Sequence, residues 1–384
     1  MIFILISLRI MSLKNGWLPK IILVFLLIVS VAASKAAVQS ESVRVAVVKG
    51  VEELRIDGAG LLAVDERGNP VQLDPPFNIR RLSDKQFSFG GRNFRRLTIS
   101  AQDRIRINGK SYRGIFDFYP SEKGLLVVNE LPVEEYLVGL INCEISSLWP
   151  IEAIKAQAVI ARSYAIYQKD SRRGSLYHLE SSVMDQVYDG IDIEDSRAAR
   201  GVTETEGEVL VAGSSVIQAF YHSSCGGHTE AAKNVWGADI DYLQGVECRY
   251  CLTAPNLRWE VTLPLKKIEQ QLKAAGHLTG TISDIRESEP NRSGRLQSLT
   301  IVGSRGVATI SAVNFRKAIG YGVIKSTNMA ISVRGDDARF SGAGNGHGVG
   351  LCQWGSKQRA ADGFNYREIL ASYYPGVRIE KLKY

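Results

Sequence analysis

The sequence predicts an α+β fold, in which a small antiparallel β domain over residues 42–129 precedes a mixed α/β domain over residues 130–384. Three observations support this. Before residue 129, short alternating or apolar runs are separated by Gly, Asp, Asn and Pro, as in a small barrel or sandwich. From Leu131 the apolar residues recur at helical spacing. From Pro150, a proline suited to a helix start precedes an alanine-lined helical pattern.

The same patterns predict the individual elements. Alternation with period two predicts strands in the first domain at 43–48, 60–64, 87–89, 97–100, 104–107, 114–118 and 124–128. In the second domain we expect strands at 209–212, 215–221, 259–263, 281–287, 296–302 and 307–310. A short helix is expected to end near Glu144, and others to cover 150–168, 194–205, 265–275 and a segment from 311. Residues 350–373 are expected to be helical after a glycine-rich turn.

The amino terminus has the layout of a secretory signal. An apolar run over 21–33 follows Lys14 and Lys20 and leads into small residues. The run is short for a membrane-spanning helix, although an uncleaved anchor stays open. Residues 1–37 are therefore predicted to be a signal peptide or N-terminal membrane anchor. The mature protein is expected at the cell envelope, in the periplasm or at the cell surface, with membrane contact only through this segment.

The net charge of +7 invites a nucleic-acid interpretation, because it reflects 47 basic against 40 acidic residues. Four of the basic residues and none of the acidic ones lie in 1–37, so the mature chain carries only about +3. We therefore expect no nucleic-acid partner. The apolar content of 45% also argues against a disordered chain.

Glu144 is a candidate general acid. It lies between an apolar helical segment and the turn at Trp149 and Pro150, where burial would raise its pKa. An exposed carboxylate at a helix end is the alternative. Lys155 and Arg162 are seven residues apart and share one helix face, so they could bind an anionic substrate or hold Glu144 in place, or simply form a solvated face.

A polar turn at 222–229 and a C-x2-C pair form a candidate metal site. Cys225, Cys248 and Cys251 with one of the two histidines of this turn, His222 or His228, would give a zinc set of three thiolates and one imidazole, and we expect His228. A closed set of four ligands is structural. A disulfide between Cys248 and Cys251 is the alternative. The chain has five cysteines, so at least one is unpaired or bound to metal.

A fourth segment, 344–355, places alternating glycines around His347. It lacks the G-K-[ST] ending of a phosphate-binding loop. The tight backbone that these glycines allow would expose the imidazole, so the segment indicates a functional site without defining its chemistry.

Together, these segments resemble the family of stage II sporulation protein D and the related amidase enhancer proteins. The resemblance covers the chain from about Val43 to its end. It is carried by residues 131–166, 185–190, 219–230, 346–355 and 369–377. Two substitutions depart from the family pattern, since Cys352 stands where Ser is common and Trp354 where Tyr is common. The zinc ligands that some members have before the Gln-Val-Tyr motif are absent from this sequence.

The resemblance implies a lytic transglycosylase that cleaves the MurNAc-β-1,4-GlcNAc bond of peptide-stripped glycan strands and leaves 1,6-anhydro ends. Glu144 would be the single acid and base, assisted by Lys155 and Arg162, and catalysis would require no cofactor. The other motif positions are predicted to bind substrate: Gln186, Tyr188, His222, Ser223, Gly226, Gly227, His347 and Gln353. The alternative is a non-catalytic wall-binding protein that activates a peptidoglycan amidase. A zinc hydrolase is a third and weaker possibility, because three thiolates on one metal favour a structural role.

Overall fold

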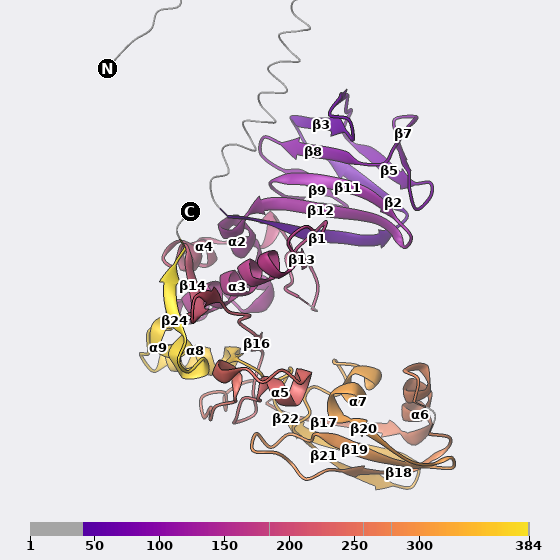
Figure 1. Ribbon diagram of the computed structural model, residues 1–384, viewed down its shortest axis with the longest axis vertical. Helices are drawn as coiled ribbons and strands as arrows, with labels where there is room; N and C mark the ends of the chain where they lie inside the picture. The colour runs from indigo at the N-terminus through magenta and orange to yellow at the C-terminus, as the bar shows by residue number, and fades with distance from the viewer. Residues whose placement is uncertain (1–40, 184, 256, 278, 383–384) are drawn as a thin grey trace, which may run out of the picture.

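The computed structural model describes residues 41–382 except 184, 256 and 278 (Figure 1). The signal or anchor predicted at 1–37 lies outside the described residues. Within the described part of the chain, no helix combines the length and apolarity needed to cross a membrane. The structure contains many helices and many strands, and the strands form several sheets. This composition confirms the predicted α+β class.

Residues 42–132 form a β-rich region of two sheets. Its strands are β1 (Ser42–Val51), β2 (Glu53–Asp57), β3 (Leu61–Asp65), β4 (Pro70–Val71), β5 (Phe77–Arg81), β6 (Phe87–Phe89), β7 (Arg92–Phe94), β8 (Leu97–Ala101), β9 (Ile105–Ile107), β10 (Lys110–Tyr112), β11 (Ile115–Ser121) and β12 (Gly124–Pro132). The sheet orders are β13-β1-β12-β11-β8-β3-β4 and β10-β9-β2-β5-β6-β7. Strand β13 (Leu179–Glu180) joins the first sheet in parallel from a later part of the chain.

The seven predicted strands of this region are present, and five more accompany them. Strand β2 shows why the others were missed: Leu54 and Ile56 are buried, but three polar residues share its five positions. So short a run carries too little apolar periodicity to stand out from a loop.

The helices α2 (Val133–Glu144) and α3 (Ile151–Ser171) pack onto the β-rich region, and α4 (Ser196–Thr203) packs onto these two helices. Pro150, the predicted first residue of this helix, is the N-cap of α3, so the helix begins one position later than predicted. Side chains such as Phe116 of β11, Tyr136 of α2 and Ile154 of α3 belong to one continuous hydrophobic core. The change at residue 129 is therefore a change of secondary structure inside a shared core.

The segments on either side of residues 258–343 form the part of the chain that follows α4 and the part that ends it. They comprise β14 (Glu208–Ala212), β15 (Ser215–Val216), β16 (Tyr221–His222), α5 (Ala232–Trp236), β23 (Leu351–Cys352), α8 (Gln353–Ala361), α9 (Tyr366–Tyr373) and β24 (Arg378–Lys381), with short 3-10 turns at Ile191–Ile193 and Asp241–Leu243. The strand expected over 215–221 is instead two short strands, β15 and β16, in different sheets. The helical ending is confirmed, as two helices.

Residues 258–343 form a lobe with its own hydrophobic core. Its elements are β17 (Arg258–Pro264), α6 (Leu265–Ala274), β18 (Ile282–Glu287), β19 (Ser298–Gly303), β20 (Gly306–Ser311), α7 (Ala312–Ile319), β21 (Met329–Arg334) and β22 (Asp337–Ala343). They make two three-stranded sheets with two helices. Figure 1 shows the lobe at one end of the long axis and the β-rich region at the other. The predicted unit 130–384 includes this lobe without separating it.

Candidate active site around Glu144

Glu144 is the last residue of α2, and the turn that follows it is held by hydrogen bonds. Asn142 accepts a hydrogen bond from the Ser147 backbone N–H (3.0 Å) and donates to an Asp195 carboxylate oxygen (2.8 Å). Asp195 also caps the start of α4. Arg197, in that helix, donates to the Ser147 carbonyl (2.7 Å). Contacts with α4 thus fix the path of the chain directly after Glu144.

The half-buried carboxylate of Glu144 meets three hydrogen-bond donors. The Val187 backbone N–H lies 3.4 Å from Oε1, and the side chains of Tyr221 and Gln353 also form hydrogen bonds with the carboxylate. Burial raises the pKa of Glu144 above its ordinary value, and these hydrogen bonds oppose part of the rise. The structure therefore gives Glu144 the elevated pKa that a general acid needs, as the sequence analysis predicts.

Gln186 orients Tyr221. Its Oε1 accepts from the Tyr136 hydroxyl (3.1 Å), and its Nε2 donates to the Tyr221 hydroxyl oxygen (3.2 Å). Because that oxygen already accepts a bond, the Tyr221 proton is left for Glu144. Gln186 is only 1% exposed, so its side chain is placed to orient Tyr221, and its predicted contact with substrate stays a prediction. Tyr221 itself was missed by the sequence analysis, although it directly precedes the predicted His222.

Tyr188, a predicted substrate-binding residue, lies in the hydrophobic core. It is 1% exposed and packs between the rings of Tyr112 (5.8 Å between centroids) and Tyr136 (5.1 Å). A Cβ at Gly139 would lie 2.6 Å from the Tyr188 ring. Tyr188 thus joins α2 to the β-rich region.

Lys155 and Arg162 are engaged by other carboxylates. Arg162 is 0% exposed and makes a bidentate pair with Glu134 (2.8 and 2.7 Å). Lys155 pairs with Glu152 (2.9 Å) and Glu204 (2.7 Å). These contacts attach α3 to α2 and α4, and they favour a structural role over the predicted catalytic one for both cations.

The pairing of β16 with β23 assembles the opposite wall of the site. These strands lie about 130 positions apart in sequence and run parallel, with Tyr221 opposite Leu351 and His222 opposite Cys352. Gln353 begins α8 immediately after β23, and its Nε2 lies 3.4 Å from the Gln157 Oε1 of α3. Tyr221 consequently reaches Glu144 from β16, and Gln353 reaches it from the start of α8, directly after β23.

His347 belongs to an aromatic cluster beside this wall. Its ring centroid lies 5.1 Å from that of Trp236 and 6.1 Å from that of Phe220, which stacks on Trp236 at 4.3 Å. Burial lowers the pKa of His347 to about 3, so the imidazole is neutral near pH 7. Trp236 is 45% exposed and offers an open aromatic face. The sequence analysis missed it, because a lone Trp at a helix end carries no pattern.

The remaining predicted substrate residues shape the backbone. His222 is buried; its Nδ1–H donates to the Val349 carbonyl (3.1 Å), and its Nε2 has no partner among the described residues. The Ser223 carbonyl accepts from the Trp354 N–H (3.1 Å). Gly226 and Gly227 have φ of +82° and +120°, which side chains rarely adopt. Only a glycine also allows the lobe backbone to approach position 226 closely.

The structure brings three of the four predicted metal ligands together with a different fourth residue. The Sγ atoms of Cys225, Cys248, Cys251 and Cys352 lie within 4.8 Å of one another, and all four residues are buried. His228 is outside this group, with its Nδ1 2.6 Å from the Thr229 carbonyl. The fourth member is Cys352, which was not among the predicted metal ligands.

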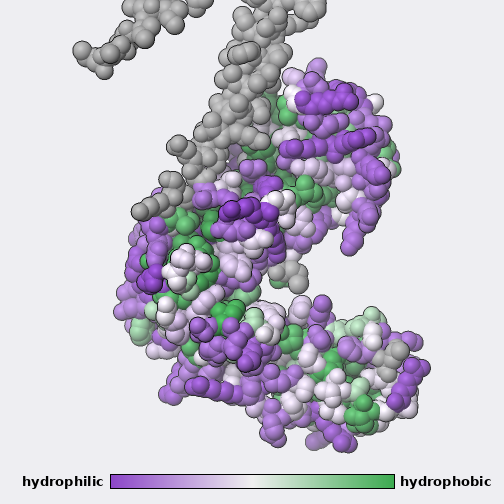
Figure 2. All heavy atoms as spheres, viewed as in Figure 1, coloured by the Kyte–Doolittle hydropathy of each residue, from purple (hydrophilic) through white to green (hydrophobic). Residues whose placement is uncertain are grey.

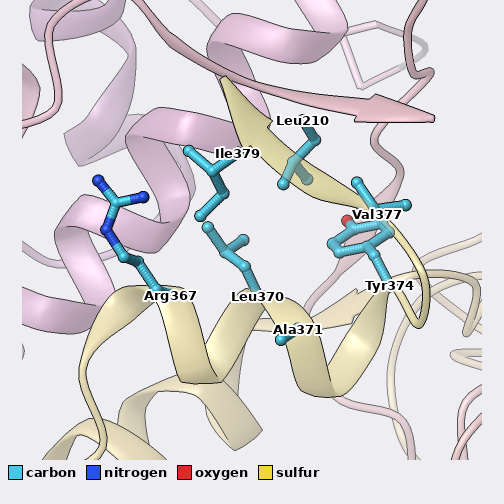
Figure 3. A pocket seen from close by; sticks show the side chains of 7 residues that line it. All are labelled: Leu210, Arg367, Leu370, Ala371, Tyr374, Val377 and Ile379. Carbon is cyan, nitrogen blue, oxygen red and sulfur yellow. The ribbon is translucent and has the colours of Figure 1, made fainter. Parts of the chain in front are cut away.

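The surface of the molecule has a broad hollow and a separate pocket. Figure 2 shows one face of the molecule hollowed between the β-rich region and the lobe, and α5 lies along the lobe side of that hollow in Figure 1. A separate pocket between α9, β14 and β24 (Figure 3) contains no predicted site residue. Its lining is Leu210, Arg367, Leu370, Ala371, Tyr374, Val377 and Ile379. The pocket therefore lies outside the candidate site.

Comparison with known proteins places two family models on the chain. The model described as "Stage II sporulation protein" matches residues 121–211, which include Glu144. A model described as "Domain of unknown function (DUF8618)" matches residues 251–350 and so covers the lobe.

Curated proteins show similarity over a longer part of the chain. An uncharacterized protein of Brachyspira hyodysenteriae is 34% identical over 74% of this chain and 76% of its own length. The amidase enhancer of Bacillus subtilis is 29% identical over 73% of this chain, and the chain spans 45% of that relative. The stage II sporulation protein D of B. subtilis is 26% identical over 66% of this chain and 76% of its own length.

Proposed function

The chain belongs to the family of stage II sporulation protein D and amidase enhancer proteins, and from this premise we propose that it is a peptidoglycan lytic transglycosylase. The proposed substrate is a peptide-stripped glycan strand, cleaved between MurNAc and GlcNAc. The observation that carries the proposal is the environment of Glu144, a half-buried carboxylate of raised pKa held by three donors.

The proposed reaction needs one carboxyl group. Protonated Glu144 gives its proton to the glycosidic oxygen, the bond from that oxygen to C1 of MurNAc breaks, and positive charge develops at C1. The carboxylate then takes the proton of the MurNAc 6-hydroxyl, whose oxygen attacks C1. The product is a 1,6-anhydro end, and no water is consumed. Because the nucleophile belongs to the substrate, proximity replaces a second carboxyl group that would activate water.

The neighbours of Glu144 suit both halves of this cycle. Burial favours the protonated acid before cleavage. After proton transfer, the hydrogen bonds from Tyr221, Gln353 and the Val187 N–H stabilise the carboxylate that remains. The half-exposed ring of Trp236 supports a role in binding a sugar ring, since aromatic faces commonly line ligand sites.

The proposal implies export to the cell envelope through residues 1–37 and requires no cofactor for the bond cleavage. It also implies a functional link to a peptidoglycan amidase, which would remove the stem peptides from the strand. The relative named amidase enhancer supports that link.

The proposal is tested on purified peptide-free glycan strands, with anhydro ends detected by mass spectrometry. Wild type is expected to release them, and Glu144→Gln is expected to lose at least about 100-fold in rate, as for removal of a general acid. Glu66→Gln makes the same chemical change at an exposed turn and should behave as wild type. Absence of anhydro ends with wild type would refute the activity, and an active Glu144→Gln would refute the role of Glu144.

A second candidate is a non-catalytic activator of a peptidoglycan amidase, and the similarity to the amidase enhancer favours it. It predicts that wild type stimulates a purified amidase on intact sacculi and that Glu144→Gln stimulates it equally. Equal stimulation, together with no anhydro ends from peptide-free strands, would support this function over the first.

A further inference from the structure

We propose that Cys225, Cys248, Cys251 and Cys352 bind one structural zinc ion at the base of the lobe. Their four sulfur atoms form a single buried group within 4.8 Å. Four thiols would release four protons as one Zn²⁺ binds, which gives a closed four-thiolate site with no open position for substrate. Cys248 and Cys251 have the C-x2-C spacing typical of zinc knuckles.

The separation of the sulfurs fits a metal better than disulfides. The Sγ atoms of Cys225 and Cys251 are 3.4 Å apart, whereas a disulfide bond is about 2.05 Å long. Zinc–sulfur bonds of about 2.3 Å in a tetrahedron place sulfurs about 3.8 Å apart. All four cysteines are unbridged, and each lies close to the other three.

Hydrogen-bond donors surround the sulfurs, as expected around thiolates. The backbone N–H groups of Cys225 and Gly355 each lie 3.3 Å from the Cys352 sulfur, and that of Gly227 lies 3.4 Å from the Cys225 sulfur. The Tyr373 hydroxyl is 3.1 Å from the Cys248 sulfur. Such outer contacts orient metal ligands and disperse their charge.

A buried cation lies beside the cluster. Arg295 is 1% exposed and donates to the carbonyls of Cys225 (2.6 Å) and His228 (2.8 Å). Four thiolates on Zn²⁺ carry a net charge of −2, and a guanidinium next to them offsets part of it. The buried Glu230 already provides one opposite charge for this arginine, and the thiolates of the cluster would add to it.

The cluster joins the lobe to the candidate active site. Cys248 and Cys251 directly precede the lobe and Cys352 follows it, while Cys225 follows β16. Cys352 also precedes Gln353, which contacts Glu144. The zinc would therefore act as a positioning element for Gln353. This positioning role rests on the proposed function, whereas metal binding does not.

Metal binding is tested on the full chain, purified after growth in zinc-supplemented medium. Elemental analysis is expected to find about one zinc per chain in wild type. Cys143→Ser changes the cysteine outside the cluster and should keep the zinc, and His228→Ala should keep it as well. Cys352→Ser should lose it.

Two further measurements do not require the variant to fold. Wild type unfolded in chelator should show five titratable thiols without reductant, and its thermal unfolding should shift to lower temperature when chelator is added. Stoichiometric iron, absence of metal, or cysteines that titrate only after reduction would overturn the proposal. Retention of zinc by Cys352→Ser with its loss from His228→Ala would overturn the ligand assignment. None of these results depends on glycan cleavage.

Discussion

The β-rich region and the lobe are both antiparallel, yet they relate differently to Glu144. The β-rich region shares one hydrophobic core with the helices α2 and α3, whereas the lobe encloses a core of its own. Figure 1 shows them at opposite ends of the molecule. Similar secondary structure therefore does not imply a similar part in the site: one region is the support of Glu144, and the other is an attached unit.

Packed side chains connect the β-rich region to the carboxylate. Phe116 of β11 contacts Tyr112 (6.0 Å between centroids), and Tyr112 contacts Tyr188. Tyr188 in turn packs on Tyr136, whose hydroxyl begins the hydrogen-bond chain to Tyr221. A disturbance in this sheet should consequently reach the site.

Polar anchors connect the lobe to the rest of the chain. Besides Arg295, the side chains of Asn291 and Ser293 donate to the buried Glu230 (2.7 and 2.8 Å). These contacts are local, so a disturbance deep in the lobe core should stay within it.

The largest expected effect comes from Phe116→Ala. Removal of this fully buried ring should lower the free energy of unfolding by about 3–5 kcal/mol. Because the core is shared, amides of α2 and α3 should lose hydrogen-exchange protection together with those of β11. Full protection of the two helices in this variant would show that the cores are separate.

The matched change in the lobe is Phe340→Ala, which removes an equally buried ring from β22. This substitution should lower the free energy of unfolding of the lobe by a similar amount, about 3–5 kcal/mol. Hydrogen exchange should accelerate only within residues 258–343. Protection of α2 is expected to stay at its wild-type level. A loss of protection in α2 would mean that the lobe supports the site directly.

The smallest expected effect is a gain in stability for Glu144→Gln. Burial raises the pKa of Glu144 in the folded chain, so the folded state holds this proton more tightly than the unfolded state. The ionised carboxylate therefore lowers the free energy of unfolding. This loss is absent below the ordinary carboxyl pKa and grows as pH rises through the pKa of Glu144 in the folded chain. The neutral glutamine should therefore raise the melting temperature near pH 7 and leave it unchanged near pH 3.

Calorimetry at both pH values checks the sign. Glu66→Gln serves as the control, because its carboxylate is exposed and should show no such difference. A melting temperature of Glu144→Gln below that of wild type near pH 7 would mean that the ionised carboxylate stabilises the fold.

The predictability of the fold differs between elements. Strand β1 and helices α2 and α3 could be predicted because each has enough buried apolar positions to show the spacing typical of a strand or a helix. Strand β2 was not predicted because it has only two buried apolar positions. The division of 215–221 was not predicted because the two-residue strands β15 and β16 are defined by their pairing partners. The separate core of the lobe depends on contacts between distant residues, which no local period records.

The candidate site shows the same limit. Glu144 was identifiable because an apolar helix ends beside a turn. Cys352 and Tyr221 were not, because their neighbours come from segments about 130 positions away, brought together by the pairing of β16 with β23. The sequence offered Gln186 and Tyr188 as ligands, and only the fold shows that both side chains are buried.

The way in which the chain enters and leaves the lobe has an evolutionary consequence. Arg258 and Ala343 are paired neighbours in β17 and β22, and the Gly344 N–H donates to the Leu257 carbonyl at 2.7 Å. Two ends so close together can be joined by a short turn. Residues 258–343 thus have the geometry of an exchangeable cassette, whose gain or loss leaves the flanking segments in register. Cys251 precedes this segment and Cys352 follows it, so both cysteines would remain in a chain that lacked residues 258–343.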